Sequence, residues 1–381
     1  MRRPLSLYIH IPFCMSKCNY CAFASVVAGE KAKNDYIDQL ISEIKNRAKE
    51  LSGGYEVQTI YIGGGTPSVL DDGKVAEILS TVYMNFIVNN NAEITIEVNP
   101  SSLTLNKARE YYGAGVTRVS MGLQASQERH LKTLGRKHTK ETFLTAVEYL
   151  KSAGITNING DVILGLPTQT EKDVKESIEV LATCGVKHIS MYMLEIEEGT
   201  KFKQLKDNDL LPLPTESETI NLYNTAKNAL EKVGYKRYEI SNFAIPGFES
   251  KHNQVYWDRG EYLGLGASAH SFVDGYRFAN SSNVNQYVSH MQIKEIPLEY
   301  KDKISEEEAQ EEAIMLALRT SKGLDLHDFS KQFGKTLLET KKEEIAKLVK
   351  DGFIATDECY TRLYATDKGF MVLNKIIEIL I

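Results

Sequence analysis

Short apolar runs alternate with longer amphipathic segments through the first half of the chain. Helical spacing of apolar positions predicts helices at about 31–51, 71–88, 104–113, 139–153 and 170–184. The apolar runs typical of strands lie at 5–11, 59–62, 94–98, 116–121, 158–164 and 188–194. Because strands and helices alternate, we expect parallel strands joined by crossover helices. The sequence therefore predicts an α/β fold, a partial (β/α)6 TIM-like barrel that is open on one side.

Two further extended segments, 237–243 and 262–267, keep a second architecture open. They could complete a closed eight-strand barrel, in which no edge strand is left. The open barrel is the favoured interpretation. We expect it to occupy 1–235, with an extension of the barrel over 236–300.

The last part of the chain, 301–381, has a different pattern. SEEEAQEEAIMLALRTSKGL predicts an amphipathic helix ended by Gly323, and LHDFSKQFG and KTLLETKKEEIAKLVKDGF predict two more helices. FIATDECYTRLYAT predicts a hairpin before a final helix. Together these elements suggest a helical, winged-helix-like domain. Its acidic residues outnumber its basic ones, which disfavours binding to phosphates, so we expect a lid or docking domain.

Composition narrows the class of protein. The 381 residues are 42% hydrophobic and 25% charged, which allows a large core and two domains. The net charge of −6 argues against nucleic acid as a partner. No apolar run reaches the roughly 18 residues of a membrane-spanning helix, and MRRPLSLYIHIPF resembles a first strand more than a signal peptide. We expect a cytoplasmic monomer or dimer without a transmembrane segment, for which peripheral membrane contact stays open.

Three of the five cysteines form a C-x3-C-x2-C run directly after the first predicted strand, at Cys14, Cys18 and Cys21. Four-iron clusters normally take one thiolate per iron, so three thiolates leave one iron of a [4Fe–4S] cluster open to a ligand from outside the protein. The alternative is a zinc site made of these cysteines and His10. Zinc sites usually combine two separated ligand pairs, and the sequence has no second pair at that spacing. The spacing therefore favours an iron–sulfur cluster.

Glycines and polar side chains lie at or near the ends of the other predicted strands. The second strand ends in a Gly63 to Thr66 turn, where backbone groups can approach a ligand because glycine has no side chain. Glu97 ends the third strand, Gln124 the fourth, and Asp161 lies in the fifth. In barrels of this kind the site is built at the carboxyl ends of the strands. We therefore expect these side chains to share one site with the cysteine run.

These segments together resemble the radical S-adenosylmethionine (SAM) superfamily, in which SAM binds the open iron of a [4Fe–4S] cluster. YIHIPFC, GGGTP, MGLQ, LGRKH and DVILGLP are similar to its oxygen-independent coproporphyrinogen III oxidase-like branch, from about residue 5 to the C-terminus. The resemblance implies that different residues bind the amino group of SAM, its carboxylate, and its ribose and adenine. The matching residues are Tyr8, Tyr20, Gly64, Gly65, Thr66, Glu97, Gln124, Arg136 and Asp161.

That branch holds two kinds of protein, an oxidase that decarboxylates coproporphyrinogen and a heme-binding protein regarded as a heme chaperone. The oxidase has a fourth cysteine two residues after the third, where this chain has Phe23. It also has an arm of several dozen residues before its first strand, whereas seven residues precede Tyr8 here. The segment HNQVYW, from His252 to Trp257, is similar to the HNxxYW signature of the heme-chaperone branch.

The resemblance therefore implies a heme chaperone that carries heme as cargo and transfers it to an unidentified acceptor protein. The implied cofactors are a [4Fe–4S] cluster, SAM and heme. His252 is the candidate heme ligand, because an imidazole can bind heme iron beside flanking aromatic rings. The alternative is the oxidase itself, which forms protoporphyrinogen IX by radical chemistry. Whether the chain is an enzyme stays open, and no catalytic residue is assigned.

Overall fold

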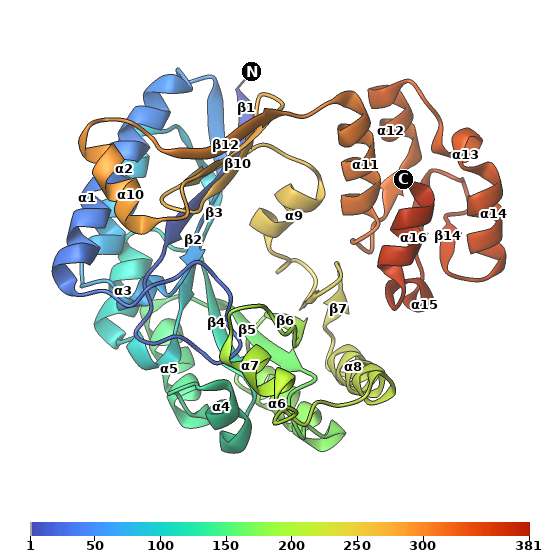
Figure 1. The fold of residues 1–381 in the computed structure, drawn as a ribbon, viewed down its shortest axis with the longest axis horizontal. Coiled ribbons are helices and arrows are strands. Elements are labelled where there is room, and N and C mark those ends of the chain that lie inside the picture. The colour runs from blue at the N-terminus through green and yellow to red at the C-terminus, as the bar shows by residue number, and fades with distance from the viewer. Residues whose placement is uncertain (1) are drawn as a thin grey trace.

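The computed structural model describes residues 2–381, and within these residues twelve strands form one sheet (Figure 1). Neighbouring parallel strands in chain order make its centre, which confirms the predicted α/β barrel strands. They are β1 (Arg3–Ile11), β2 (Tyr55–Gly64), β3 (Val88–Val98), β4 (Arg118–Gln124), β5 (Asn157–Leu164) and β6 (His188–Met193). The connecting helices are α1 (Glu30–Glu50), α2 (Lys74–Asn85), α3 (Leu105–Gly113), α4 (Glu128–Leu134), α5 (Lys140–Ala153) and α6 (Glu171–Thr183).

The sheet stays open because the later strands extend it at both edges. Beyond β1 lie β9 (Tyr262–Leu265), β10 (His270–Val273), β11 (Tyr276–Asn280) and β12 (Leu298–Lys303). Beyond β6 lie β8 (Asn242–Ala244) and β7 (Lys236–Arg237). The two segments that could have closed an eight-strand barrel thus stand on opposite edges, so the open barrel is the correct alternative. The helices of this region are α7 (Lys201–Asp207), α8 (Glu216–Lys232), α9 (Lys251–Trp257) and α10 (Val284–Gln292).

Period-two alternation gives the central sheet one apolar and one polar face. On β1, Leu7 and Ile9 are buried in the main hydrophobic core together with Ile37 of α1. The alternate residues Tyr8 and His10 project from the other face and form hydrogen bonds there. The outer face therefore holds the helices, and the inner face supplies polar groups for a site.

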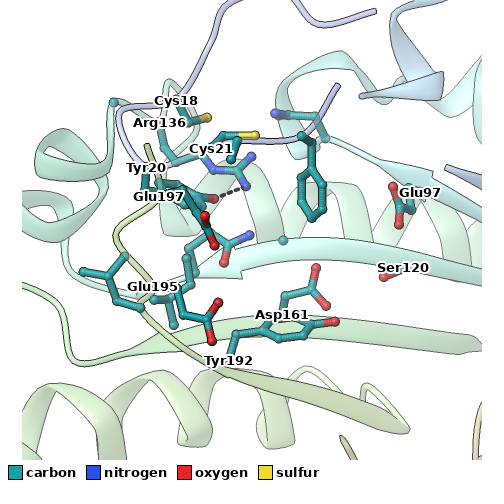
Figure 2. A pocket seen from close by; sticks show the side chains of 18 of the residues that line it. Cys18, Tyr20, Cys21, Glu97, Ser120, Arg136, Asp161, Tyr192, Glu195 and Glu197 are labelled. Carbon is teal, nitrogen blue, oxygen red and sulfur yellow. Dashed lines mark hydrogen bonds between the residues drawn. The ribbon is translucent and has the colours of Figure 1, made fainter. Parts of the chain in front are cut away.

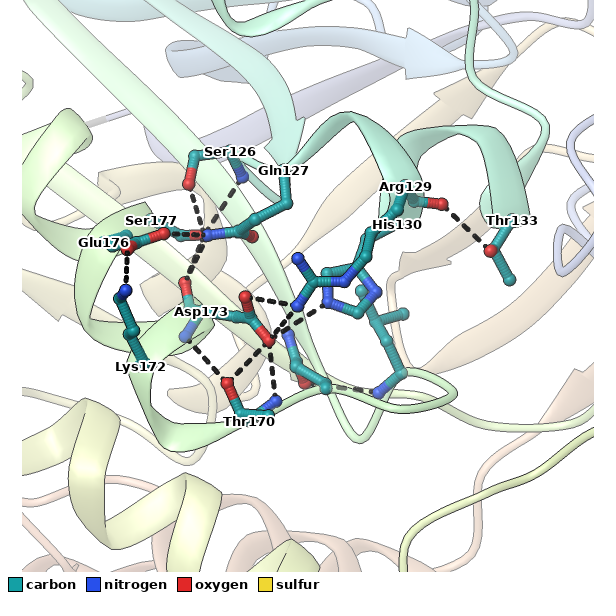
Figure 3. A network of polar contacts seen from close by, with 12 residues as sticks. Ser126, Gln127, Arg129, His130, Thr133, Thr170, Lys172, Asp173, Glu176 and Ser177 are labelled. Carbon is teal, nitrogen blue, oxygen red and sulfur yellow. Dashed lines mark hydrogen bonds and ion pairs between the residues drawn. The ribbon is translucent and has the colours of Figure 1, made fainter.

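A polar network joins α4 to the start of α6 (Figure 3). Asp173 accepts hydrogen bonds from the backbone N–H and the hydroxyl of Thr170 at 2.8 and 2.7 Å, which completes a capping box. Arg129 and His130 of α4 contact the same carboxylate. One buried side chain thus fixes both the helix start and the neighbouring helix.

The last elements pack around a hydrophobic core of their own, centred on residues such as Leu318, Leu363 and Ile376. The helices are α11 (Glu306–Ala317), α12 (Leu326–Phe333), α13 (Leu337–Thr340), α14 (Lys342–Lys350), α15 (Asp367–Phe370) and α16 (Leu373–Leu380). The small sheet consists of β13 (Leu324–Asp325), β14 (Ile354–Thr356) and β15 (Arg362–Ala365). The predicted third helix is broken into α13 and α14 at Lys341, and the other predicted elements are present.

None of the helices in residues 2–381 combines the length and the apolar character that crossing a bilayer requires.

Candidate functional site

A cavity of about 960 Å³ lies at the carboxyl ends of the central strands. Its walls come from the loop after β1, the ends of β2 to β6, and α8 and the chain after α15. Figure 2 shows Cys18, Cys21, Tyr20 and Arg136 at one part of the cavity and Glu97 at another, with Asp161 between them and Glu195 nearby. The cavity therefore lies at the carboxyl ends of the strands, where the sequence predicted the site.

The cysteine loop lies between β1 and α1, and its three thiols line the cavity as free, partly buried groups. The Sγ of Cys14 is 3.5 Å from the Oγ1 of Thr66. Burial raises the pKa of the Cys18 and Cys21 thiols, so a bound cation must compensate for their ionisation.

The spacing of the sulfur atoms bears on the choice between a zinc ion and a [4Fe–4S] cluster at these cysteines. Around one zinc ion, thiolates at 2.3 Å from the metal would stand about 3.8 Å apart. In residues 2–381, the group of three or more potential metal ligands within 4.8 Å of one another is Asp325, His327 and Asp328, and the cysteines do not form one. The three sulfurs are therefore not gathered around a single ion position in this structure.

The glycine turn after β2 packs directly against the cysteine loop. Gly65 and Thr66 donate backbone hydrogen bonds to the carbonyls of Ile11 and Phe13 at 2.9 and 2.7 Å. A Cβ on Gly65 would stand 2.7 Å from the Phe13 carbonyl oxygen, so only glycine permits this approach. Gly64 has a φ of 110° and supports the same turn. The turn therefore sets the position of the loop that carries the thiols.

Glu97 lies at the end of β3 and is held by two donors. The Tyr61 hydroxyl donates to Oε1 at 2.8 Å and the Gly64 N–H donates to Oε2 at 3.0 Å. Burial raises the pKa of the Glu97 carboxyl against the effect of these hydrogen bonds. A ligand ammonium group would compensate the buried charge, which fits the amino group of SAM.

Arg136 and Tyr20 form the opposite end of this polar surface (Figure 2). The Arg136 guanidinium donates to the Tyr20 hydroxyl at 2.7 Å. The Nε of Arg136 is buried and has no hydrogen-bond partner. A partly buried guanidinium with an unpaired, buried Nε donor fits a carboxylate, because a carboxylate accepts forked hydrogen bonds. The residue therefore suits the carboxylate of SAM.

Gln124 and Asp161 also line the cavity. Gln124 has a φ of 66°, an uncommon conformation for a residue with a side chain. Asp161 accepts a hydrogen bond from the Asn159 amide at 2.6 Å, and burial raises the pKa of its carboxyl. Both side chains can form hydrogen bonds with hydroxyl groups of a ligand in the cavity.

Two of the predicted ligand-binding residues do not line the cavity. Tyr8 stacks against Tyr61 with ring centroids 6.2 Å apart, and its hydroxyl is 3.0 Å from Nδ1 of His10. His252 is 1% exposed. Its Nδ1 bonds to Thr59 at 2.7 Å and its Nε2 bonds to Tyr256 at 2.8 Å. Burial lowers the pKa of His252 to about 3, so the ring is neutral near pH 7.

Sequence reasoning missed several residues of the cavity wall. Ser120 lies on β4, and Tyr192, Glu195 and Glu197 lie on or after β6. The expectation that site residues lie at the carboxyl ends of the strands was not applied to the sixth strand. Applied there, it would have indicated Tyr192, Glu195 and Glu197. Nothing in the local sequence marks the side chains from α8 and from the chain after α15 as part of the cavity wall. They reach the cavity only because segments distant in the chain pack together.

Comparison with known proteins gives two matches to protein families. Residues 8–181 match the Radical SAM superfamily, and residues 304–372 match the HemN C-terminal domain. The structure of coproporphyrinogen III oxidase (HemN) from Escherichia coli, a radical SAM enzyme, is similar in fold. It gives a TM-score of 0.87 at 24% identity and covers 100% of this chain and 90% of that one.

Curated relatives match along almost the whole chain. The heme chaperone HemW of Lactococcus lactis is 35% identical over 381 residues, which cover 99% of this chain and 97% of that protein. The heme chaperone HemW of Bacillus subtilis is 32% identical, with 97% of each chain covered. From the cysteine loop, the strand-end cavity and this full-length similarity, we conclude that the chain belongs to the radical SAM superfamily and, within it, to the HemW family.

Proposed function

We propose that this protein binds heme and transfers it to an acceptor protein, on a scaffold that holds a [4Fe–4S] cluster and SAM. The observation that carries the proposal is the 35% identity to the heme chaperone HemW of Lactococcus lactis over nearly the full length of both chains. A match of that extent includes the barrel, the segment with α9 and the C-terminal elements. It therefore applies to the protein as a whole and not to one motif.

Phe23 supports the chaperone over the oxidase. It occupies the place of the fourth cysteine in the oxidase pattern, and it lines the cavity and is 71% exposed. A thiol at this position could act in redox chemistry, whereas a phenyl ring offers only an apolar surface. The loop of this chain is thus equipped to contact an apolar ligand beside the cluster.

The cavity residues have separate tasks under this proposal. Cys14, Cys18 and Cys21 would hold the cluster, and the bound cluster with SAM would serve a structural, oligomerisation or transfer-gating role. Glu97 and Gly64 position the amino group of SAM and Arg136 positions its carboxylate. Gln124 and Asp161 hold the ribose, and the Tyr20 ring lies beside Arg136 near the adenine. Tyr8 supports this surface through Tyr61.

The proposal also covers the cargo, the acceptor and the place of transfer. The cargo is heme, the acceptor is a protein still to be identified, and the transfer takes place in the cytoplasm. The chain acts as a monomer or a dimer. Peripheral membrane contact would be compatible with a membrane-bound acceptor.

The test is an anaerobic heme titration of the cluster-reconstituted protein, followed by desalting and addition of apomyoglobin as a model acceptor. A Soret band that survives desalting and then moves to myoglobin supports the chaperone. In parallel, the protein receives SAM, a reductant and coproporphyrinogen III. Formation of protoporphyrinogen IX without retained heme would overturn the proposal in favour of the oxidase.

A further inference from the structure

The side chains that line the cavity are of two kinds. Glu97, Gln124, Arg136 and Asp161 are polar. Apolar side chains from the cysteine loop, from α8 and from the chain around α15 line the cavity as well. These are Met15, Phe23, Ile220, Tyr223, Phe370 and Met371.

Large apolar side chains on this surface are unusually exposed. Phe23 is 71% exposed, Met15 57% and Met371 41%. They come from chain segments about 350 residues apart, yet they line one cavity. Exposed apolar groups that gather in one concave place mark a ligand site, because scattered exposure would not produce such a surface.

Resting on the proposed function, we propose that heme binds against these apolar side chains, between the cysteine loop and the chain around α15, with Met371 as the axial ligand of the iron. The porphyrin is a flat apolar disc, and the walls that would face it are apolar or aromatic. Two exposed lysines, Lys17 and Lys137, also line the cavity. Their ammonium groups suit the two propionates of heme, which carry negative charge.

The choice of axial ligand follows from which donors reach the cavity. Among residues 2–381, no histidine lines it, and both ring nitrogens of His252 already have hydrogen-bond partners. The three cysteines of the loop are assigned to the cluster. Among the other side chains that line the cavity, methionine sulfur and tyrosine oxygen are common ligands of heme iron. The site is therefore expected to use a methionine or a tyrosine.

Met371 is favoured because its neighbours fix its position. Asp367 at the start of α15 accepts a hydrogen bond from Arg237 at 2.6 Å and pairs with Lys227. The same Arg237 lies 3.8 Å over the centroid of the Phe370 ring. These contacts anchor α15 to the barrel, so the following Met371 is held at the cavity wall. Heme would then contact both the barrel and the C-terminal elements.

The test compares heme binding by the full-length, cluster-reconstituted protein and four variants. Met371→Leu keeps the size of the side chain but removes the sulfur, and Phe23→Ser removes an apolar wall. His252→Gln tests the alternative ligand. Met84→Leu is the matched control, because Met84 is 72% exposed on α2 and does not line the cavity. Hemin is titrated anaerobically, and affinity and the absorption and magnetic circular dichroism spectra are recorded.

We expect Met371→Leu to weaken heme binding about tenfold and to remove the near-infrared charge-transfer band of thioether-ligated ferric heme. Phe23→Ser should weaken binding with the band retained, and the His252 and Met84 variants should bind as the wild type does. Circular dichroism and iron content confirm that each variant is folded and loaded. If wild type binds heme but Met371→Leu leaves affinity and spectrum unchanged, this site is wrong while the proposed function stands. If wild type retains no heme, the proposed function itself fails.

Discussion

At the scale of single residues, the thiols of the cysteine loop give the most direct test of the cluster. Cys14→Ser should reduce iron and acid-labile sulfide after anaerobic reconstitution to the background level, because an alcohol is a poor ligand for these irons. Cys184→Ser is the control, since Cys184 is a partly buried thiol at the end of α6 and outside the cavity. Unchanged iron and sulfide in the Cys14 variant would falsify the cluster assignment.

The carboxylate of Glu97 gives a second residue-scale prediction. Glu97→Gln keeps the shape but loses the charge that would pair with the SAM ammonium, so affinity for SAM should fall about tenfold or more. Anaerobic isothermal titration calorimetry on the reconstituted protein measures this change. Glu195→Gln, at another part of the same cavity, should change affinity less than about twofold. Equal losses in both variants would mean that only the overall charge of the cavity matters.

At the scale of elements, Asp173 ties the start of α6 to α4. Although burial opposes its ionisation, hydrogen bonds from Thr170 and Arg129 lower the pKa of Asp173 to about 2. The folded carboxylate therefore adds stability above pH 4, near the pKa of an unfolded aspartate. This contribution is lost as the pH falls from about 4 to about 2.

We expect Asp173→Asn to lower the free energy of unfolding by about 2 kcal/mol at pH 7, with the difference from wild type shrinking below pH 4. Urea denaturation at several pH values measures it. Glu171→Gln, in the same first turn but with an exposed side chain, should stay within about 0.5 kcal/mol of wild type. A difference that grows toward acid pH would contradict this account of the network.

Helix α9 depends on the buried His252 for its attachment to the barrel. Its ring bonds to Thr59 of β2 and to Tyr256, and its backbone N–H donates to Glu93 of β3 at 3.1 Å. His252→Ala should lower the free energy of unfolding by about 3 kcal/mol, because it leaves a cavity and unpaired polar groups. His270→Ala, at an exposed histidine bonded to Tyr300, should cost less than about 1 kcal/mol. Thermal unfolding compares the two, and equal losses would show that burial of His252 is unimportant.

At the scale of the whole molecule, ion pairs of two acidic residues, Glu312 and Asp367, hold the C-terminal elements to the barrel. Glu312 of α11 pairs with Arg277 and, at 2.7 Å, with Arg259, and all three side chains are largely buried. Asp367 of α15 pairs with Arg237 but is itself mostly exposed. Buried charge pairs lose more than exposed ones when one partner is removed, because a buried charge is left uncompensated.

Glu312→Gln should therefore destabilise the junction by about 2–3 kcal/mol, whereas Asp367→Asn should cost about 1 kcal/mol or less. Hydrogen exchange of peptides from α11 and α15 reports the local opening, and peptides from α5 serve as an internal reference. The ranking is wrong if the Asp367 variant opens the junction more than the Glu312 variant.

Much of the barrel could be predicted from the sequence because its signals are local. Every strand of the central sheet has a run of apolar residues, and the connecting helices other than α4 span enough turns to show their period. Helix α4, with 7 residues, is too short for that signal and was missed. The break at Lys341 was missed as well, since amphipathic spacing continues across it.

The cysteine spacing, the glycine turn and the polar strand ends could be predicted from the amino-acid sequence, because each depends on residues that are neighbours in the chain. The sequence gives no sign that α8 and the residue after α15 complete the cavity, or that Tyr8 and His252 lie outside it. Those facts depend on contacts between segments 100 or more residues apart, such as Arg237 with Asp367 and His252 with Thr59. Local patterns carry no information about such contacts, since packing of the whole chain sets which groups meet.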